Sequence, residues 1–202
     1  MKQNKKIIAI TGSISTGKST ISKIIREFGY KVLDLDKIGH EILDDPEINK
    51  KVSKAFNQDF TENGKFSRKK LSKYIFKDKD DREKLDKLNS ILHREIFNKL
   101  NQSIEESKEK IIFVDIPLII ELMDTLDDYS FSYDELWLVY VDRNEQEKRL
   151  MLRDNISKEE ARQKINTQMS IEDKKKYADE IIENYDLEDA KNQIQKLVKN
   201  LI

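Results

Sequence analysis

The chain has 202 residues, enough for one sizeable domain, and its 38 basic and 39 acidic side chains leave a net charge of −1. A balance this close to zero gives no general attraction to nucleic acid or to an anionic membrane, so we expect neither as a partner. The absence of cysteine excludes disulfides and cysteine-ligated zinc, and the two histidines, His40 and His93, exclude a multi-histidine metal site. No apolar run approaches the roughly 20 residues that span a bilayer, and the first apolar run is too short for a signal peptide. We therefore expect a soluble, cytoplasmic protein.

The first predicted element is a short, continuously apolar strand at 6–11, which is typical of a strand buried on both faces. Residues 12–19 follow it directly and fit the pattern G-x-x-x-x-G-K-[ST]. A helix is expected from Lys18 to a stop at Gly29. Its buried face is predicted to consist of Ile21, Ile24, Ile25 and Phe28. A buried strand before this pattern and a helix after it are the context in which the pattern holds phosphate.

The chemistry of phosphate binding accounts for these residue types. Backbone N–H groups surround the phosphate oxygens, and glycine permits the backbone path that turns them inward. Lys18 is expected to contact the β- and γ-phosphates of a nucleoside triphosphate, and the Ser19 hydroxyl to ligate Mg²⁺. Thr20 stands one residue too late for the metal and is assigned to the α-phosphate. The predicted segment that binds this triphosphate is Gly12, Ser13, Ile14, Ser15, Thr16, Gly17, Lys18, Ser19 and Thr20.

Further strands are predicted at 31–36, 110–119 and 135–142, with a short fifth at 180–185. They alternate with helical patterns, which predicts the α/β class, with a central parallel sheet of about five strands flanked by helices. The last predicted helix, at 187–202, is amphipathic. Its core-facing residues are predicted to be Ala190, Ile194, Leu197, Val198 and Leu201.

Two helical blocks interrupt this alternation. The block at 37–110 is far longer than one crossover helix, so we interpret it as a helical substrate-binding insertion. The block at 143–177 contains two helical patterns, of which the second opens with a capping box of Ser157 and Glu160. We interpret this block as a lid. The predicted core is then 1–36, 111–142 and 178–202 within a single domain of 1–202.

Carboxylates follow three of the predicted strands, where ligands bind in open α/β sheets. Asp34 and Asp36 end the second strand and are expected on the same side of it, Asp115 ends the third, and Asp142 ends the fourth. Such a carboxylate can hold Mg²⁺ or accept a proton from an attacking hydroxyl, or it can cap the next helix. We favour the functional role for Asp36 and the capping role for Asp142, and leave both open for Asp34.

Arg149 and Arg153 stand four residues apart on one face of a lid helix. Two like charges at this spacing repel each other, and a bound phosphate would relieve the repulsion. The alternative is a solvated pair of Arg149 with Glu145. We favour phosphate binding.

Residues 36–39, DKIG, match the D-x-x-G tetrapeptide of GTPases but follow Lys18 too closely, and no N-K-x-D guanine box is present. A GTPase switch is therefore not expected. A nucleotide-dependent regulator is disfavoured by the charge balance. Another small-molecule kinase, such as a nucleoside monophosphate kinase, stays an alternative.

Six segments, read in chain order, resemble the dephospho-CoA kinase family over most of the chain. They are IIAITGSISTGKST, VLDLDKIGHEIL, LHREIF, VDIPLIIEL, VDRNEQEKRLMLRDNISKEEARQKINTQM and KKKYADEIIEN. The most specific are the D-x-D at 34–36, the D-x-P-L-x-x-E block at 115–121, and the lid with R-x-x-x-R and a later glutamine. The resemblance implies a P-loop kinase with a helical CoA domain and a lid.

The activity implied by the resemblance is ATP-dependent phosphorylation of the ribose 3′-hydroxyl of dephospho-CoA, the last step of coenzyme A synthesis. It implies that Asp36 is the proposed catalytic base, that Lys18 and Arg149 act in catalysis, and that Arg153 contacts ATP. It implies substrate contacts by Asp36, His93, Asp115, Pro117, Leu118 and Glu121. The implied cofactors are ATP and Mg²⁺. The sequence predicts no oligomeric state.

The chain departs from the family at several positions. The family usually has glycine where Ser13 and Ser15 stand, and serine at 15 makes positive φ at this position a test of the loop. Lys164 replaces a common lid arginine, and the family's Asn-Gly after the last strand is Asn184-Tyr185 here. The family's His-Pro is His93-Arg94, and His40 stands where many members have arginine.

Overall fold

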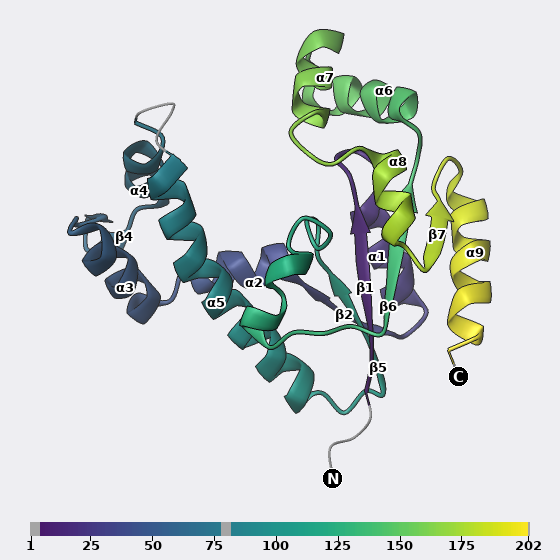
Figure 1. Ribbon diagram of the computed structural model, residues 1–202, viewed down its shortest axis with the longest axis horizontal. Coiled ribbons are helices and arrows are strands. Elements are labelled where there is room, and N and C mark those ends of the chain that lie inside the picture. The colour runs from purple at the N-terminus through teal and green to yellow at the C-terminus, as the bar shows by residue number, and fades with distance from the viewer. Residues whose placement is uncertain (1–4, 78–81, 202) are drawn as a thin grey trace. The chain divides into compact units, whose positions relative to one another are not determined.

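The computed structural model describes residues 5–77 and 82–201. The described residues form two compact units, one within Met1–Asp34 and Ser107–Ile202 and the other within Leu35–Glu106. The first unit contains the central sheet, and the second contains most of the predicted helical insertion (Figure 1). Each unit contains buried apolar residues of its own, among them Phe113 and Trp137 in the first and Val52 and Leu71 in the second.

The first unit is built on a parallel sheet in the order β2-β5-β1-β6-β7, which confirms the predicted α/β class. The strands are β1 (Lys6–Gly12), β2 (Lys31–Asp34), β5 (Ile111–Asp115), β6 (Glu135–Tyr140) and β7 (Glu180–Glu183). The central strands are almost wholly buried, as expected for parallel strands covered on both faces. Their carboxyl ends meet at one edge, which fixes where a ligand site can form.

One face of the sheet packs against α1 (Lys18–Glu27) and α9 (Leu187–Lys199). Trp137, Phe113, and Ile8 and Ile10 of β1 form this core with the apolar side of each helix. The predicted apolar faces of both helices are confirmed, with Leu197, Leu201 and Phe28 partly buried at the margin. Gly29 ends the α1 region at φ 89, a left-handed conformation that glycine adopts without a Cβ clash.

The other face carries a smaller apolar contact. Ile171 of α8 (Ile171–Lys174) packs on Leu138 and Tyr140 of β6. The segment after β5 continues into two short 3₁₀ helices, η1 (Met123–Thr125) and η2 (Asp127–Tyr129), and η3 (Lys175–Tyr177) follows α8.

The predicted lid block forms α6 (Arg143–Asp154) and α7 (Lys158–Ile165), as the sequence indicated. Asp142 accepts a hydrogen bond from the Glu145 N–H and caps α6, and the capping box of Ser157 and Glu160 opens α7. Leu150, Ala161 and Ile165 pack between the two helices. That this pair moves as a lid stays a prediction.

The second unit is mainly helical. Its helices are α2 (Leu35–Ile42), α3 (Pro46–Phe56), α4 (Arg68–Ile75) and α5 (Arg82–Glu106). It also contains a small antiparallel hairpin of β3 (Thr61–Glu62) and β4 (Lys65–Phe66), which the wholly helical interpretation missed. The assignment of this unit to CoA binding stays a prediction.

Two details of the predicted strands were wrong. The second strand ends at Asp34, and Asp36 lies in the first turn of α2, so the two carboxylates do not alternate along one strand as expected. Two features of the sequence explain this helix. The buried Ile38 and Ile42 stand four residues apart, which is a helical spacing. The negative charge of Asp36 in the first turn also interacts favourably with the helix dipole. The third strand ends at Asp115, earlier than its apolar run suggested.

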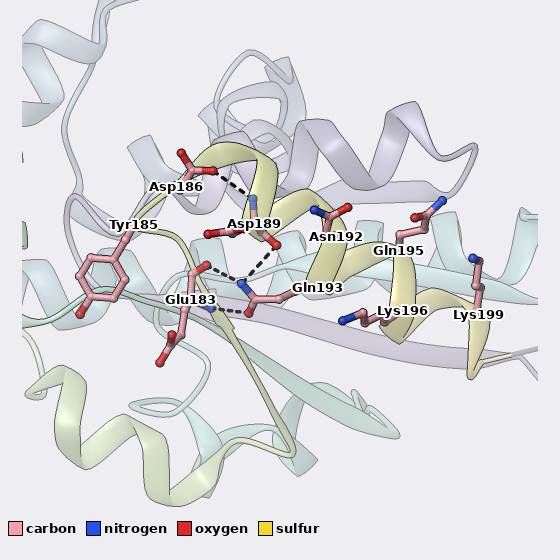
Figure 2. Close-up of a pocket in the computed structure, with 9 residues that line it drawn as sticks. All are labelled: Glu183, Tyr185, Asp186, Asp189, Asn192, Gln193, Gln195, Lys196 and Lys199. Carbon is pink, nitrogen blue, oxygen red and sulfur yellow. Dashed lines mark hydrogen bonds between the residues drawn. The ribbon is translucent and has the colours of Figure 1, made fainter.

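A groove of about 540 Å³ lies along β7 and α9, and the residues that line it come from these two elements and the turn between them. Figure 2 shows the Gln193 side chain beside the Glu183 backbone, where it accepts from the N–H at 3.0 Å and donates to the carbonyl at 2.9 Å. Among the described residues, no helix is long and apolar enough to cross a membrane.

Candidate active site

The phosphate loop runs from Gly12 to Gly17 between β1 and α1, and its two glycines are required by close contacts. A Cβ on Gly12 would lie 2.6 Å from the Thr16 Oγ1. Gly17 has φ 86, and a Cβ there would lie 2.2 Å from the Asn184 Nδ2. Thr16 is fully buried and its hydroxyl donates to the Ser13 carbonyl at 2.9 Å. The loop is therefore a folded, internally bonded structure.

Ser15 adopts φ 62, the left-handed conformation that the family supplies with glycine at this position. The loop therefore has the positive φ at position 15 that glycine would allow, although serine stands there. This conformation is energetically unfavourable for serine and not for glycine. Within the described residues, the buried hydroxyls of Ser13 and Ser15 have no hydrogen-bond partner. Unpaired polar atoms of this kind suit a loop that binds a polar ligand such as a phosphate group.

Lys18 forms an ion pair with Asp115 at the end of β5. The Asp115 side chain is 4% exposed and its second oxygen accepts from the Ser22 hydroxyl at 2.6 Å. Asp115, which the resemblance assigns to substrate, therefore contacts the phosphate-loop lysine directly. The pair holds the Lys18 ammonium at the carboxyl edge of the sheet, where β1 and β5 end side by side.

Two side chains from distant segments also contact the loop. The Asn184 Nδ2, just after β7, donates to the Thr16 carbonyl at 2.8 Å. The Gln168 Oε1, between α7 and α8, accepts from the Ile14 N–H at 2.9 Å. The Ile14 side chain packs against the apolar contact between α6 and α7. The loop, the end of β7 and the α6–α7 pair are thus in direct contact.

Of the two predicted lid arginines, the structure brings one to the loop. Arg149 donates to the Glu145 Oε1 and to the Asn184 carbonyl, both at 2.8 Å. Its Nη1 lies 3.7 Å from the place that a Cβ on Gly17 would take. The pairing with Glu145 considered as the alternative is therefore present, and it places the guanidinium beside the loop. Arg153 instead pairs with its neighbour Asp154 at 2.8 Å and is exposed.

Glu147 fastens α7 to α6. The Oε1 of this buried carboxylate lies 3.0 Å from the Nε of Arg162 on α7 and 3.3 Å from the Nε of Arg143 on α6. Burial raises the pKa of Glu147, but hydrogen bonds from Arg162 and Arg143 outweigh it and hold the pKa below its ordinary value. A carboxylate that stays ionised can keep both arginines in place near neutral pH.

The remaining residues of the D-x-P-L-x-x-E block lie along the segment after β5. The Pro117 carbonyl accepts from the Thr11 hydroxyl at 2.9 Å, and Leu118 is 42% exposed. Glu121 pairs at 2.9 Å with Lys174, whose side chain is fully buried. This pair joins the segment to α8, so Glu121 has a structural contact in addition to the substrate role that the resemblance implies.

Asp36 and His93 belong to the second unit. Asp36 lies in the first turn of α2, two residues beyond the end of β2 along the chain. His93 lies on α5, and burial lowers the pKa of its imidazole below the ordinary value of 6.5. A neutral imidazole near pH 7 follows, which can accept a hydrogen bond as well as donate one.

The donor types at the loop fit a magnesium nucleotide. Ser19 is exposed at the start of α1, and Asp115 supplies a carboxylate at the adjacent strand end. Hydroxyl and carboxylate oxygens are the protein ligands that Mg²⁺ takes beside substrate phosphates. In the described part of the chain, no cluster of three or more His, Cys, Asp or Glu side chains is arranged to hold a metal ion.

Sequence reasoning missed the site contacts of Asn184, Gln168 and Ser22. Asn184 had a usable signal, because it directly follows the last strand at the same edge as the predicted carboxylates. Gln168 was noted only as part of the lid pattern. Ser22 gave no signal, because serine within an amphipathic helix does not reveal a partner on another strand.

Comparison with known proteins gives a consistent result. Residues 6–189 match the model of the family described as dephospho-CoA kinase. The dephospho-CoA kinase of Carboxydothermus hydrogenoformans is 39% identical over 199 residues, covering 96% of this chain and 93% of the relative. The Campylobacter jejuni dephospho-CoA kinase structure has a TM-score of 0.64 at 29% identity, with 97% of each chain covered. The Thermus thermophilus protein TT1252 has a TM-score of 0.81 at 28% identity, with 98% of each covered.

Proposed function

Because the chain belongs to the dephospho-CoA kinase family, we propose that its phosphate-loop site transfers the γ-phosphoryl group of ATP to the ribose 3′-hydroxyl of dephospho-CoA. The observation that carries the proposal is the phosphate loop itself, with Lys18 paired to Asp115 and Arg149 held beside Gly17. Cationic groups placed in this way are what phosphoryl transfer requires, because its catalysis is mainly positioning and charge stabilisation.

The loop binds the donor. Its N–H groups and the dipole of α1 hold the phosphates of ATP, with Lys18 directed to the β- and γ-phosphates. Gly12, Ser13, Ile14, Ser15, Thr16, Gly17, Ser19 and Thr20 complete the proposed ATP contacts. Mg²⁺, when bound with the nucleotide, would neutralise phosphate charge, and Ser19 is its proposed protein ligand.

The reaction forms a bond from the acceptor oxygen to the γ-phosphorus and breaks the bond from that phosphorus to the β–γ bridging oxygen, whose electron pair leaves with ADP. We propose that the Asp36 carboxylate accepts the acceptor hydroxyl's proton, and that Arg149 stabilises charge on the transferring group. Arg153 would need to leave Asp154 to contact ATP.

We likewise propose which residues contact the acceptor substrate, dephospho-CoA. Asp115 ends β5, and Pro117, Leu118 and Glu121 follow it, with exposed Leu118 offering apolar surface. His93, kept neutral by burial, is proposed as an acceptor contact in the helical unit. A cytoplasmic location stays a prediction from the sequence.

The proposal is tested by ADP release in a coupled assay with ATP, Mg²⁺ and, in turn, dephospho-CoA, AMP or adenosine. We expect turnover with dephospho-CoA and confirmation of CoA as the product by mass. Faster turnover with AMP would instead favour a nucleoside monophosphate kinase.

Two substitutions test the assigned roles. Asp36→Asn should lower kcat by about 10²-fold to 10⁴-fold while ATP binding survives. Glu41→Gln, an exposed acid on the same helix, is its matched control and should keep kcat. Lys18→Ala should weaken both ATP binding and turnover, whereas Lys23→Ala, exposed on the same helix α1, should change neither. Near-normal turnover in Asp36→Asn would remove Asp36 as the base.

A further inference from the structure

Asn184 contacts three separate parts of the site. It directly follows β7, is 6% exposed, and its Nδ2 donates to the Thr16 carbonyl at 2.8 Å. Its own carbonyl accepts from Arg149 at 2.8 Å, and its N–H donates to the Tyr140 carbonyl at 2.9 Å. The side-chain amide makes the first of these bonds and the backbone makes the other two, so turning the amide would break its bond to Thr16 in a buried place.

The amide is also in steric contact with the loop. A Cβ on Gly17 would lie 2.2 Å from the Asn184 Nδ2, so the amide nitrogen occupies the space that any side chain at 17 would need. Glycine at this position thus serves two needs, the φ of 86 and the approach of the amide.

The hydrogen bond to Thr16 fixes the direction of one peptide group. The peptide that joins Thr16 to Gly17 is planar, and its carbonyl and N–H point in opposite directions. Because the Thr16 carbonyl is bound to Asn184, the Gly17 N–H points away from Asn184. The peptide cannot flip without breaking this bond in a buried place.

We infer that Asn184 is a positioning residue for ATP binding, whose amide holds the Thr16–Gly17 peptide in the orientation that presents its N–H to phosphate. The inference rests on the proposed function, since it takes the loop to be the ATP site. Through its carbonyl, the same residue anchors Arg149 beside the loop, so the donor site and the α6 arginine share one support.

The test compares Asn184→Ala and Asn184→Asp with the unaltered protein, measuring ATP affinity by calorimetry without acceptor, and thermal stability in parallel. Asn184→Ala should raise the Kd for ATP by about tenfold, since the peptide loses its only side-chain restraint among the described residues. Asn192→Ala, which removes an exposed amide on α9, is the matched control and should leave the Kd unchanged.

Asn184→Asp separates orientation from packing, because its side chain has nearly the same shape. An ionised carboxylate cannot donate to the Thr16 carbonyl, whereas a protonated one can. ATP binding by this variant should therefore be weak near about pH 8 and recover, relative to the unaltered protein, as the pH is lowered toward about 5 and the buried carboxyl takes up a proton, with the adjacent Arg149 guanidinium moving this recovery to lower pH than burial alone would give. A purely structural role would lower stability without this recovery.

Two results would overturn the inference: an unchanged ATP Kd in Asn184→Ala, or a pH profile of Asn184→Asp parallel to that of the unaltered protein. Failure of the proposed function looks different. In that case dephospho-CoA is not phosphorylated, while the effect of position 184 on ATP affinity persists.

Discussion

The Ile14 N–H in the phosphate loop donates a 2.9 Å hydrogen bond to the Gln168 side chain, which stands 154 residues later in the chain. The Ile14 side chain packs at the same time against Leu150, Ala161 and Ile165 of α6 and α7. Through one residue, the loop is therefore joined to the helix pair by both a polar and an apolar contact. A movement of the helices would be transmitted to the loop through both.

Gln168→Ala should weaken ATP binding by roughly threefold to tenfold, because the loop loses a restraint equal to about one hydrogen bond. The measurement is the ATP Kd by calorimetry. Gln163→Ala removes an exposed glutamine from α7 and is the matched control. Equal affinities in the two variants would mean that the contact does not shape the loop.

Ser15→Gly should stabilise the protein slightly. Relief of the left-handed conformation is worth about 1–2 kcal/mol and is partly cancelled by the extra freedom of glycine in the unfolded chain, about 0.4–1 kcal/mol. Urea denaturation measures the difference. Ser72→Gly, at an exposed helical position of α4, should have the opposite sign, a loss of about 0.5 kcal/mol.

Ser15→Val should lower the free energy of unfolding by about 2 kcal/mol, because a β-branched side chain is strained at positive φ. Its ATP affinity should fall as well. Stability equal to that of Ser15→Gly would show that the loop can adopt another conformation at this residue.

The Lys174–Glu121 pair should respond asymmetrically to substitution. Glu121→Gln leaves a fully buried ammonium without its charge partner and should cost about 3–5 kcal/mol. Lys174→Met leaves a carboxylate that is 26% exposed, so it should cost less, about 1–3 kcal/mol. Urea denaturation gives both values, and Lys176→Met, an exposed neighbour, is the control with little expected change. A larger loss in Lys174→Met would contradict this account.

His93 should make stability depend on pH. Burial lowers the pKa of folded His93 below 6.5, so the unfolded chain takes up this proton at the higher pH. The free energy of unfolding should therefore decline as pH falls below about 6.5. His93→Gln should flatten the decline between about pH 7 and pH 5, while His40→Gln should retain it, since His93 is then intact. A slope unchanged in His93→Gln would assign it to other groups.

Periodicity and strand-end logic predicted the sheet, the helices at its faces and both caps of the α6–α7 pair. Local patterns decide these features, as with the apolar run of β1 or the capping box of Ser157. The predicted position of Asp36 at the end of a strand was wrong, because β2 passes directly into α2 within residues 31–42. Residue propensities alone do not show where the strand ends and the helix begins. The hairpin at 61–66 was missed because four short-strand residues carry no period.

The site was predicted where one segment supplies the chemistry and missed where distant segments meet. The phosphate loop is contiguous, so Lys18 and both glycines were found from the pattern. The contacts of Asn184 with Thr16 and of Ser22 with Asp115 join positions 168 and 93 residues apart, and such pairings follow from the packing of the fold.

The side-chain amide of Gln193 has a consequence for how the protein behaves at high concentration. By bonding the N–H and carbonyl of Glu183, it fills the place that a neighbouring chain's backbone would take at the open margin of the sheet. Unfilled backbone groups at such a margin are a template for intermolecular strand addition and hence for aggregation. One glutamine on the last helix thus helps to keep separate copies from joining through their sheets.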